Sequence, residues 1–200
     1  FISVKVSIHQ ANYFPYLGFF HKLSLSDIFV VMDDVQYQYD HTNRNKIVAN
    51  NVRGWTRIII PTKKEHKFSL IKDVEIDNEL PWRETNWHQI NETYENSPFF
   101  NLYEKYLESL YKQEWTHLFA INLEIIKKII QWLNIKTEII LESQLNVSGN
   151  STERLVNVCK TIGADTYVSG MGGKTYLNEK LFGENKIKLV YQNYTSIIYP

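Results

Sequence analysis

Cysteine is almost absent from this sequence, and so are long apolar runs. Cys159 has no second cysteine to pair with, which excludes an internal disulfide and favours a reducing, cytoplasmic compartment. No apolar run reaches the roughly 18 residues that a membrane-spanning helix requires, and the N-terminal residues lack the pattern of a signal peptide. We therefore expect a cytoplasmic protein that does not insert into a membrane.

A surplus of charge is also missing, because 22 basic and 22 acidic side chains cancel. A net charge of zero removes the broad positive field with which nucleic-acid-binding proteins attract phosphates, so we expect no broad nucleic-acid binding. The hydrophobic share of 44% and the charged share of 22% are typical of a globular chain. A length of 200 residues suits one large domain or two small ones.

Strands and helices are expected to alternate at both ends of the chain. Apolar and alternating runs predict strands at 4–9, 28–32, 55–61, 137–141, 165–169 and about 188–191. Helical spacing and start signals predict helices at about 15–25, 82–94, 98–113, 116–133 and 151–161. Residues 36–54 are expected to form an irregular loop, 63–67 a charged turn, and 71–76 an edge strand or hairpin partner.

This order predicts an α/β fold with a mostly parallel, Rossmann-like sheet and helices on both faces. We expect a single domain over residues 1–200 with a helical insertion at about 81–134.

Polar side chains gather where the first strand meets the first helix. The set comprises His9, Gln10, Asn12, Tyr13, His21 and Lys22. In open α/β sheets, ligands bind beyond the carboxyl ends of the strands, and helix amides there favour a phosphate. The alternative is that His9 only ends a strand and that the neighbouring aromatic residues belong to the core.

Two further groups follow the second strand. Asp33 and Asp34, with Gln36 nearby, could bring a carboxylate to Mg²⁺ or to an amine substrate, or could simply end the strand. The next group, suited to a phosphate or carboxylate clamp, is Asn43, Arg44, Asn45 and Lys46. The alternative for this second group is a solvated charged turn.

A glycine-rich bend follows the strand at 165–169, where backbone amides can approach a ligand closely. Its candidate binding residues are Ser169, Gly170 and Gly172. The spacing matches neither a Walker loop nor a dinucleotide fingerprint. We expect no structural zinc, because no metal-ligand spacing relates His66, His88 and His117 to one another or to the cysteine. Cys159 itself is expected to be a small buried apolar residue.

The chain resembles the WbqC-like family over nearly its whole length. The resemblance rests on the blocks at 8–22, 33–36, 43–46 and 167–170. It implies an enzyme of bacterial O-antigen, lipopolysaccharide or other surface polysaccharide biosynthesis that attaches glycine or another amino acid to an amino sugar. The family usually has proline where this chain has Ala11, and it usually continues past Pro200, so the resemblance implies that a longer chain could complete the site.

A second, weaker resemblance relates the first strand and helix to nucleotidyltransferases and class I synthetases. In those proteins paired histidines near a helix start stabilise ATP phosphates, although their strict His-x-Gly-His spacing is missing here. By this analogy, ATP with Mg²⁺ would be the cofactor if the amino acid is activated on the enzyme.

The expected substrates are a nucleotide-linked amino sugar and an activated amino acid, supplied as an adenylate, a charged tRNA or a thioester. His9 or His21 is expected to bind phosphate or developing negative charge, and Asp33 or Asp34 to orient or deprotonate the amine. Arg44 and Lys46 are expected to clamp a diphosphate, while Tyr13, Tyr37 or Trp55 could stack on a ring. The alternative function is a non-catalytic sugar-nucleotide or polysaccharide-binding component of an assembly complex.

Overall fold

A computed structural model describes residues 3–64 and 68–196. The chain divides into two compact units, each described by itself below. Unit 1 comprises Phe1–Ala11, Pro15–Asp34 and Ile126–Pro200, and unit 2 comprises Asn12–Phe14 and Val35–Ile125. Helix α4 (Leu118–Trp132) carries the chain from unit 2 back into unit 1.

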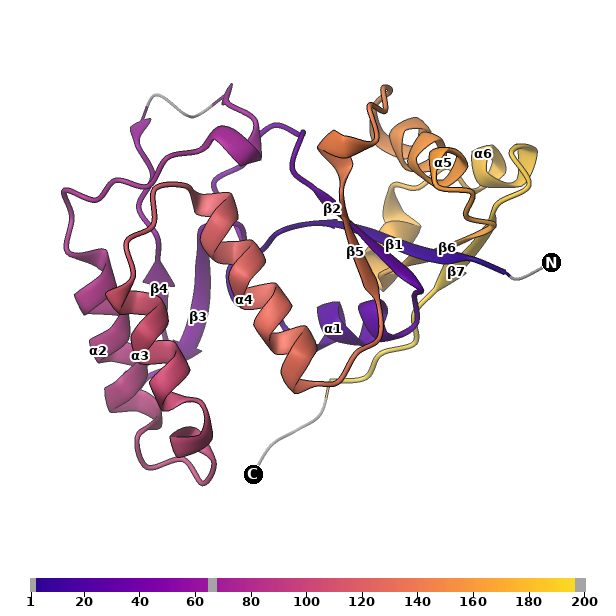
Figure 1. Cartoon of the computed structure of the whole chain (residues 1–200). Coiled ribbons are helices and arrows are strands. Elements are labelled where there is room, and N and C mark those ends of the chain that lie inside the picture. The colour runs from indigo at the N-terminus through magenta and orange to yellow at the C-terminus, as the bar shows by residue number, and fades with distance from the viewer. Residues whose placement is uncertain (1–2, 65–67, 197–200) are drawn as a thin grey trace. The chain divides into compact units, whose positions relative to one another are not determined.

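Unit 1 is built on a five-stranded sheet in which all neighbouring strands are parallel (Figure 1). Its strands are β1 (Lys5–Gln10), β2 (Ile28–Met32), β5 (Glu138–Leu141), β6 (Thr166–Ser169) and β7 (Lys188–Tyr191). Its helices are α1 (Leu17–Ser24), α5 (Ser151–Thr161), α6 (Glu179–Glu184) and the second part of α4. The predicted α/β fold with a parallel sheet is therefore confirmed.

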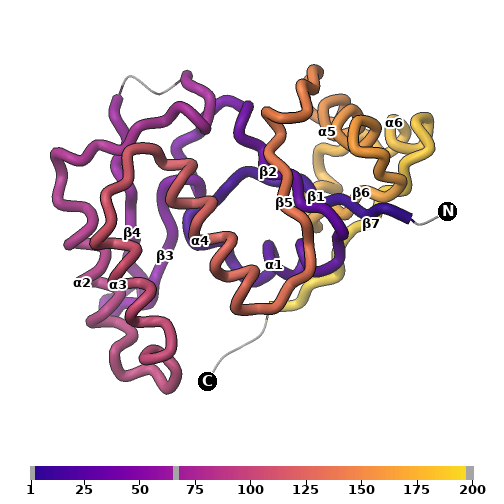
Figure 2. The backbone as a smooth tube through the Cα atoms, viewed as in Figure 1, coloured from indigo at the N-terminus to yellow at the C-terminus, as the bar shows by residue number. Residues whose placement is uncertain are grey.

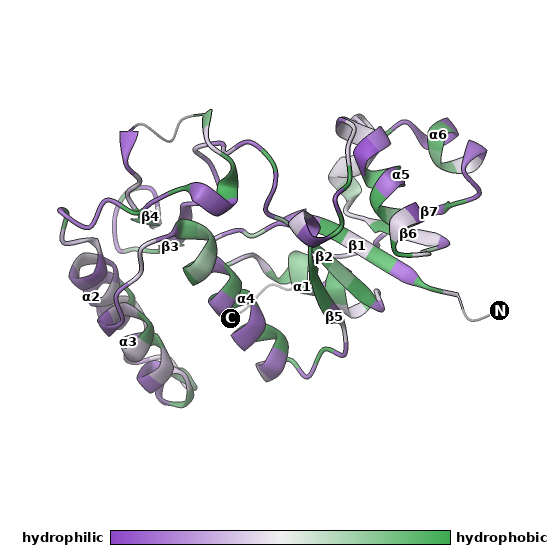
Figure 3. Cartoon of the chain, turned by 45° about the horizontal axis from the view of Figure 1, so that its top comes forward, coloured by the Kyte–Doolittle hydropathy of each residue, from purple (hydrophilic) through white to green (hydrophobic). Residues whose placement is uncertain are grey.

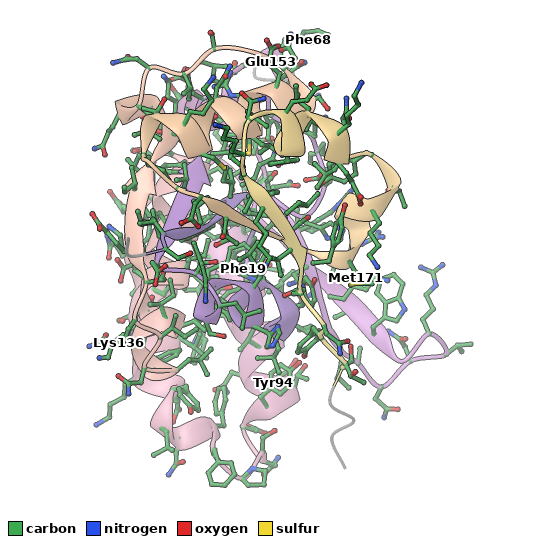
Figure 4. The ribbon with its side chains drawn as sticks, turned by 90° about the vertical axis from the view of Figure 1, so that its right-hand side faces the viewer. Phe19, Phe68, Tyr94, Lys136, Glu153 and Met171 are labelled. Atoms are coloured by element: carbon green, nitrogen blue, oxygen red, sulfur yellow. The ribbon has the colours of Figure 1, made fainter. Side chains whose placement is uncertain are left out.

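Helices cover both faces of this sheet. Val6 and Ile8 of β1 belong to a core that includes Cys159 of α5 and Phe182 of α6. On the other face the ring of Phe19, in α1, meets the strands, and Figure 4 shows Phe19 and α5 on opposite sides of the sheet. The apolar run of β2, whose three central residues are buried, lies between β5 and β1, and Figure 3 colours it green.

The strand order is β5-β2-β1-β6-β7. From β1 the chain adds strands first on one side of the sheet and later on the other, so the order of the strands reverses next to β1 although all of them run parallel. The chain leaves β1 toward β2 on one side, and the later strand β6 pairs with β1 on the other side (Figure 2). The strands that end at Gln10, Met32 and Ser169 are therefore neighbours in one parallel sheet. In sheets of this type, ligands bind beyond the carboxyl ends of the strands at such a reversal, which here lies between β1 and β6.

Unit 2 is built on an antiparallel hairpin and helices. Its elements are β3 (Arg44–Val48), β4 (Trp55–Ile59), α2 (Trp82–Tyr94), α3 (Glu104–Lys112) and the first part of α4. Asn86 of α2 forms the two hydrogen bonds to β4 that a neighbouring strand would otherwise form. Its side-chain oxygen accepts from the Ile59 N–H at 3.2 Å, and its nitrogen donates to the Ile59 carbonyl at 2.9 Å. This side chain satisfies backbone groups of β4 that face α2.

The prediction of an irregular loop at 36–54 is wrong, because β3 lies within it. Ile47 is buried and Lys46 is exposed, as alternation in a half-buried strand requires. The pattern escaped recognition because the other inward position of the strand is the polar Asn45, whose amide donates to the carbonyl of Tyr13.

Two other predicted elements also differ from the structure. Residues 71–76 hold a 3₁₀ turn (Ile71–Asp73) and isolated bridges in place of an edge strand. The helix expected at 98–113 is divided into a 3₁₀ turn (Phe100–Leu102) and α3. The charged turn expected at 63–67, including His66, lies largely outside the described residues. Within the described part of the chain, no helix has the length and apolar character needed to cross a membrane.

Candidate functional site

Three segments of unit 1 converge at the carboxyl edge of its sheet. The Nδ1 atom of His21, in α1, lies 3.2 Å from the Oε1 atom of Gln192, which directly follows β7. The backbone N–H of Gln192 donates to the carbonyl of Ser169, at the end of β6, over 2.8 Å. A histidine is therefore held against the strand ends by a side chain whose own backbone is fixed to the sheet.

The partners of both histidines at this edge determine which ring nitrogen carries the proton. The Oε1 atom of Gln192 can only accept, so the neutral ring of His21 carries its proton on Nδ1 and has its basic lone pair on Nε2. His9 behaves in the same way, because its Nδ1 lies 3.0 Å from the carbonyl of Gln10. The His9 ring also packs edge-on against Phe19, with ring centroids 5.3 Å apart. Both rings thus present Nε2 as the basic nitrogen.

An aromatic pair lies beside His21. Tyr194 packs against the His21 ring with centroids 5.4 Å apart and against Tyr16 with centroids 6.2 Å apart. A Cβ atom on Gly18 would collide with the rings of both tyrosines, so glycine at this position permits the pair to lie on α1. Tyr16 is 64% exposed, which leaves an aromatic ring available to a sugar or a base at this edge.

Lys22, the neighbour of His21, is buried rather than exposed to a ligand. Its Nζ atom donates to the carbonyl of Ile8 over 3.3 Å and lies 5.9 Å from the centre of the Phe19 ring. Burial lowers the pKa of this lysine to about 7, because the charged ammonium is removed from water. The lysine therefore titrates near neutral pH beneath the end of β1.

The glycine-rich bend contains glycines in different surroundings. A Cβ atom on Gly173 would collide with the Ser169 hydroxyl, so close packing requires glycine there. Gly172 has open space at its Cβ position, and a Cβ on Gly170 would meet only the Gln192 amide at 3.7 Å. No packing contact requires glycine at these two positions, which is compatible with a ligand lying against the bend.

Both predicted carboxylates after β2 have partners within unit 1. The oxygens of Asp33 accept from the backbone N–H and the hydroxyl of Ser143, at 2.8 and 2.6 Å. Asp34 faces Arg154 of α5, whose guanidinium lies 3.9 Å from its carboxylate and donates to its backbone carbonyl over 3.1 Å. Arg154 also donates to the fully buried Glu142 over 2.6 Å. Through these contacts Asp33 and Asp34 connect the end of β2 to Ser143 and to Arg154 of α5. Their predicted roles toward an amine stay predictions.

The remaining predicted residues belong to unit 2, and several lie in its core. The hydroxyl of the buried Tyr13 is hydrogen-bonded to that of Tyr111, and burial raises its pKa above the ordinary value. The amide of the buried Asn43 donates to the carbonyl of Ile60 over 3.0 Å. Asn45 bonds the carbonyls of the Tyr13–Phe14 turn, where Phe14 has a φ of 45°. These contacts hold the turn that leaves β1.

The cations predicted as a clamp lie on β3. Arg44 donates to the carbonyl of Tyr39 over 2.9 Å and lies 4.6 Å from the centre of its ring. Lys46 is exposed, with its Nζ atom 4.1 Å from the centre of the Trp55 ring. Gln36 is exposed and forms an isolated bridge with Leu70. Asn12 is half-buried.

The structure therefore sorts the predicted residues into two sets. Unit 1 holds His9, Gln10, His21, Lys22, Asp33, Asp34, Ser169, Gly170 and Gly172. Unit 2 holds Asn12, Tyr13, Gln36, Asn43, Arg44, Asn45 and Lys46. Across residues 3–64 and 68–196, no three or more His, Cys, Asp or Glu side chains are arranged to hold a metal ion.

Comparison with known proteins identifies the family, since residues 10–200 match the WbqC-like protein family. The chain belongs to the WbqC-like family. Among curated proteins, this WbqC-like chain is similar to the uncharacterized protein Rv1507c of Mycobacterium tuberculosis (strain ATCC 25618 / H37Rv). The two are 30% identical over 193 residues, which cover 95% of this chain and 82% of that protein. No solved structure matches the chain.

Sequence reasoning missed Gln192 and Tyr194 in this WbqC-like site. Both follow the last strand, and the run from Gln192 to Ser196 shows no regular pattern that would draw attention to it. Arg154 and Glu142 were missed for a different reason. Their spacing in the chain carries no signal, and only the packing of α5 beside the end of β5 brings the two charges together.

Proposed function

We propose that this WbqC-like protein transfers an aminoacyl group, glycyl in the simplest case, to the amine of a nucleotide-linked amino sugar used for bacterial surface polysaccharide. The observation that carries the proposal is the hydrogen bond between His21 and Gln192 beside the end of β6. It provides a histidine with a fixed tautomer at the strand reversal where α/β sheets bind ligands. Membership of the WbqC-like family is compatible with an enzyme of this kind.

The proposed reaction begins with the neutral amine of the sugar. Its nitrogen attacks the carbonyl carbon of the activated amino acid, a C–N bond forms, and the carbonyl electron pair moves to oxygen. Nε2 of His21 accepts the proton that the nitrogen loses. The proton on Nδ1 stays there, hydrogen-bonded to the side-chain oxygen of Gln192. Collapse of the tetrahedral intermediate breaks the bond to the leaving group, which departs with the electron pair.

The neighbouring residues receive supporting roles. His9, at the end of β1, is assigned to the negative charge of the leaving group or of the oxyanion, a role that requires the imidazolium form, in which Nε2 also carries a proton and can donate it. Tyr16 is assigned to the sugar or base as a stacking surface, because its ring is exposed beside His21. The open space at the Cβ position of Gly172 would allow the substrate to lie against the bend.

The experiment supplies the purified chain with a nucleotide-linked amino sugar and with glycyl adenylate, glycyl-tRNA or a glycyl thioester in separate reactions. Mass spectrometry then detects the amide product. Product with any of these donors supports the transferase. Binding of the sugar nucleotide without product from every donor would instead favour the alternative, a non-catalytic binding component.

A further inference from the structure

The outer face of the β3–β4 hairpin carries cations on both strands. Ile47 and Ile58 are buried and define the inner face of the hairpin. Since successive strand residues point to opposite faces, Lys46, Trp55 and Arg57 share the outer face. Lys46 and Arg57 are exposed, and Trp55 is half-buried between solvent and the hairpin.

The two cations lie directly opposite each other across the strands. Lys46 and Arg57 are register partners, so their Cβ atoms are about 4.5–5.5 Å apart. Like charges in this position destabilise a strand pair. The ion pairs within residues 3–64 and 68–196 include neither side chain, so no carboxylate of the described residues forms an ion pair with either cation.

Both cations lie near the ring of Trp55. The Nζ atom of Lys46 lies 4.1 Å and the Cζ atom of Arg57 lies 5.2 Å from the centre of its ring. The negative face of an indole attracts cations, but more weakly than an anion would. Arg44, which lies on β3 with Lys46, instead contacts the ring of Tyr39 and donates to its carbonyl. Lys46 and Arg57 thus place two positive charges beside one half-buried aromatic ring.

We propose that this surface is an anion subsite, in which Lys46 and Arg57 together hold a pyrophosphate group and Trp55 provides the surface beneath it. An anion with several charges neutralises both cations at once and removes their repulsion. The guanidinium offers paired N–H donors to phosphate oxygens, and the ammonium adds a compact charge. The inference goes beyond the transfer reaction proposed above and does not depend on it.

The size and charge of the surface favour a diphosphate over a nucleic acid. The opposed cations and the single ring occupy neighbouring positions of one short hairpin. A chain with zero net charge lacks the wide positive field that attracts a long polyanion. The diphosphate of a nucleotide or a nucleotide-linked sugar matches this surface in both size and charge.

The test is calorimetric titration of the full chain with inorganic pyrophosphate at fixed ionic strength. The variants are Lys46→Gln and Arg57→Gln, with Lys180→Gln as a matched loss of one exposed charge that is paired with Glu184. A second measurement follows tryptophan emission in wild type and in Trp55→Phe, with circular dichroism as the folding control for each variant.

We expect wild type and Lys180→Gln to bind pyrophosphate equally, and each hairpin variant to bind at least about tenfold more weakly. The emission change on binding should disappear in Trp55→Phe. Unchanged affinity in the folded hairpin variants, or no binding by wild type, would overturn the inference. A short single-stranded RNA that displaces pyrophosphate at lower concentration would also overturn it, in favour of a nucleic-acid surface. Because no step of amide formation is measured, failure here leaves the proposed transfer reaction unaffected.

Discussion

Gly172 and Gly173 are neighbours in the chain, yet their surroundings predict different responses to the same substitution. A Cβ on Gly173 would collide with Ser169 and lie 2.8 Å from Leu177, whereas the same atom on Gly172 would meet nothing. Gly173→Ala should therefore lower the free energy of unfolding by about 1–3 kcal/mol through overpacking. Gly172→Ala should change it by less than about 0.5 kcal/mol.

Urea unfolding followed by circular dichroism measures both variants. The pair is its own control, because the two changes add the same methyl group at adjacent positions. Equal losses of stability in the two variants would show that the bend does not pack as described.

The buried lysine predicts how stability depends on pH. Its pKa is lowered from 10.5 to about 7, so between these values the unfolded chain binds a proton that the folded chain does not. The free energy of unfolding should consequently rise with pH above 7, by about 1–2 kcal/mol between pH 7 and 8.5. This interval ends below the ordinary pKa of the Cys159 thiol, 9.0, which burial raises to about 12.

Lys22→Met removes the titrating group and keeps a long apolar side chain in the same space. As the pH rises from 7 to 8.5, the unfolding free energy of wild type should rise relative to that of this variant, because only wild type contains the titrating lysine. Parallel curves for the two proteins would show that Lys22 has an ordinary pKa in the folded chain.

At the scale of elements, Arg154 connects α5 to the ends of two strands. It binds the buried Glu142, which follows β5, and the carbonyl of Asp34, which follows β2. Arg154→Met should leave the Glu142 carboxylate buried without its partner, at a cost of about 3–5 kcal/mol in unfolding free energy. Adding Glu142→Gln to that variant should restore most of the loss, since no charge then remains buried.

Chemical denaturation of wild type, the single variants and the double variant gives the coupling energy. A double variant that is as unstable as the sum of its single changes would contradict a direct pairing of these two side chains.

Elements with a strong internal pattern were predictable from the sequence. The apolar run of β2 and the helix α5 have the predicted bounds, Ile28–Met32 and Ser151–Thr161. Strand β3 was not predictable, because the polar Asn45 occupies an inward position, where its side-chain nitrogen donates to the carbonyl of Tyr13, far away in the chain. The 3₁₀ turn at Ile71–Asp73 was missed because a few residues alternate as readily in a turn as in a strand.

The candidate site was predictable only in part, for a related physical reason. The sequence pointed to His9 and His21, because the first strand of an α/β sheet leads directly into the first helix, although the structure places His21 in the last turn of that helix. It could not point to Gln192, since the hydrogen bond to His21 depends on where β7 ends. Nor could it show that Lys22 is buried, because lysine is ordinarily an exposed residue.

At the scale of the whole molecule, the net charge is zero, but each unit contains a local group of side chains that could bind a ligand. Unit 1 holds the histidines at the strand reversal, and unit 2 holds the opposed cations of the hairpin. The central claim concerns unit 1, where His21 is proposed to accept the proton of the sugar amine.

The rate of amide formation by His21→Gln, relative to wild type, tests this claim most directly. His88→Gln is the matched control, because His88 is an exposed histidine of α2 paired with Glu92. Loss of a general base should lower the rate by about 10²-fold or more in His21→Gln and leave His88→Gln unchanged, with both variants folded. Full turnover by folded His21→Gln would contradict the account.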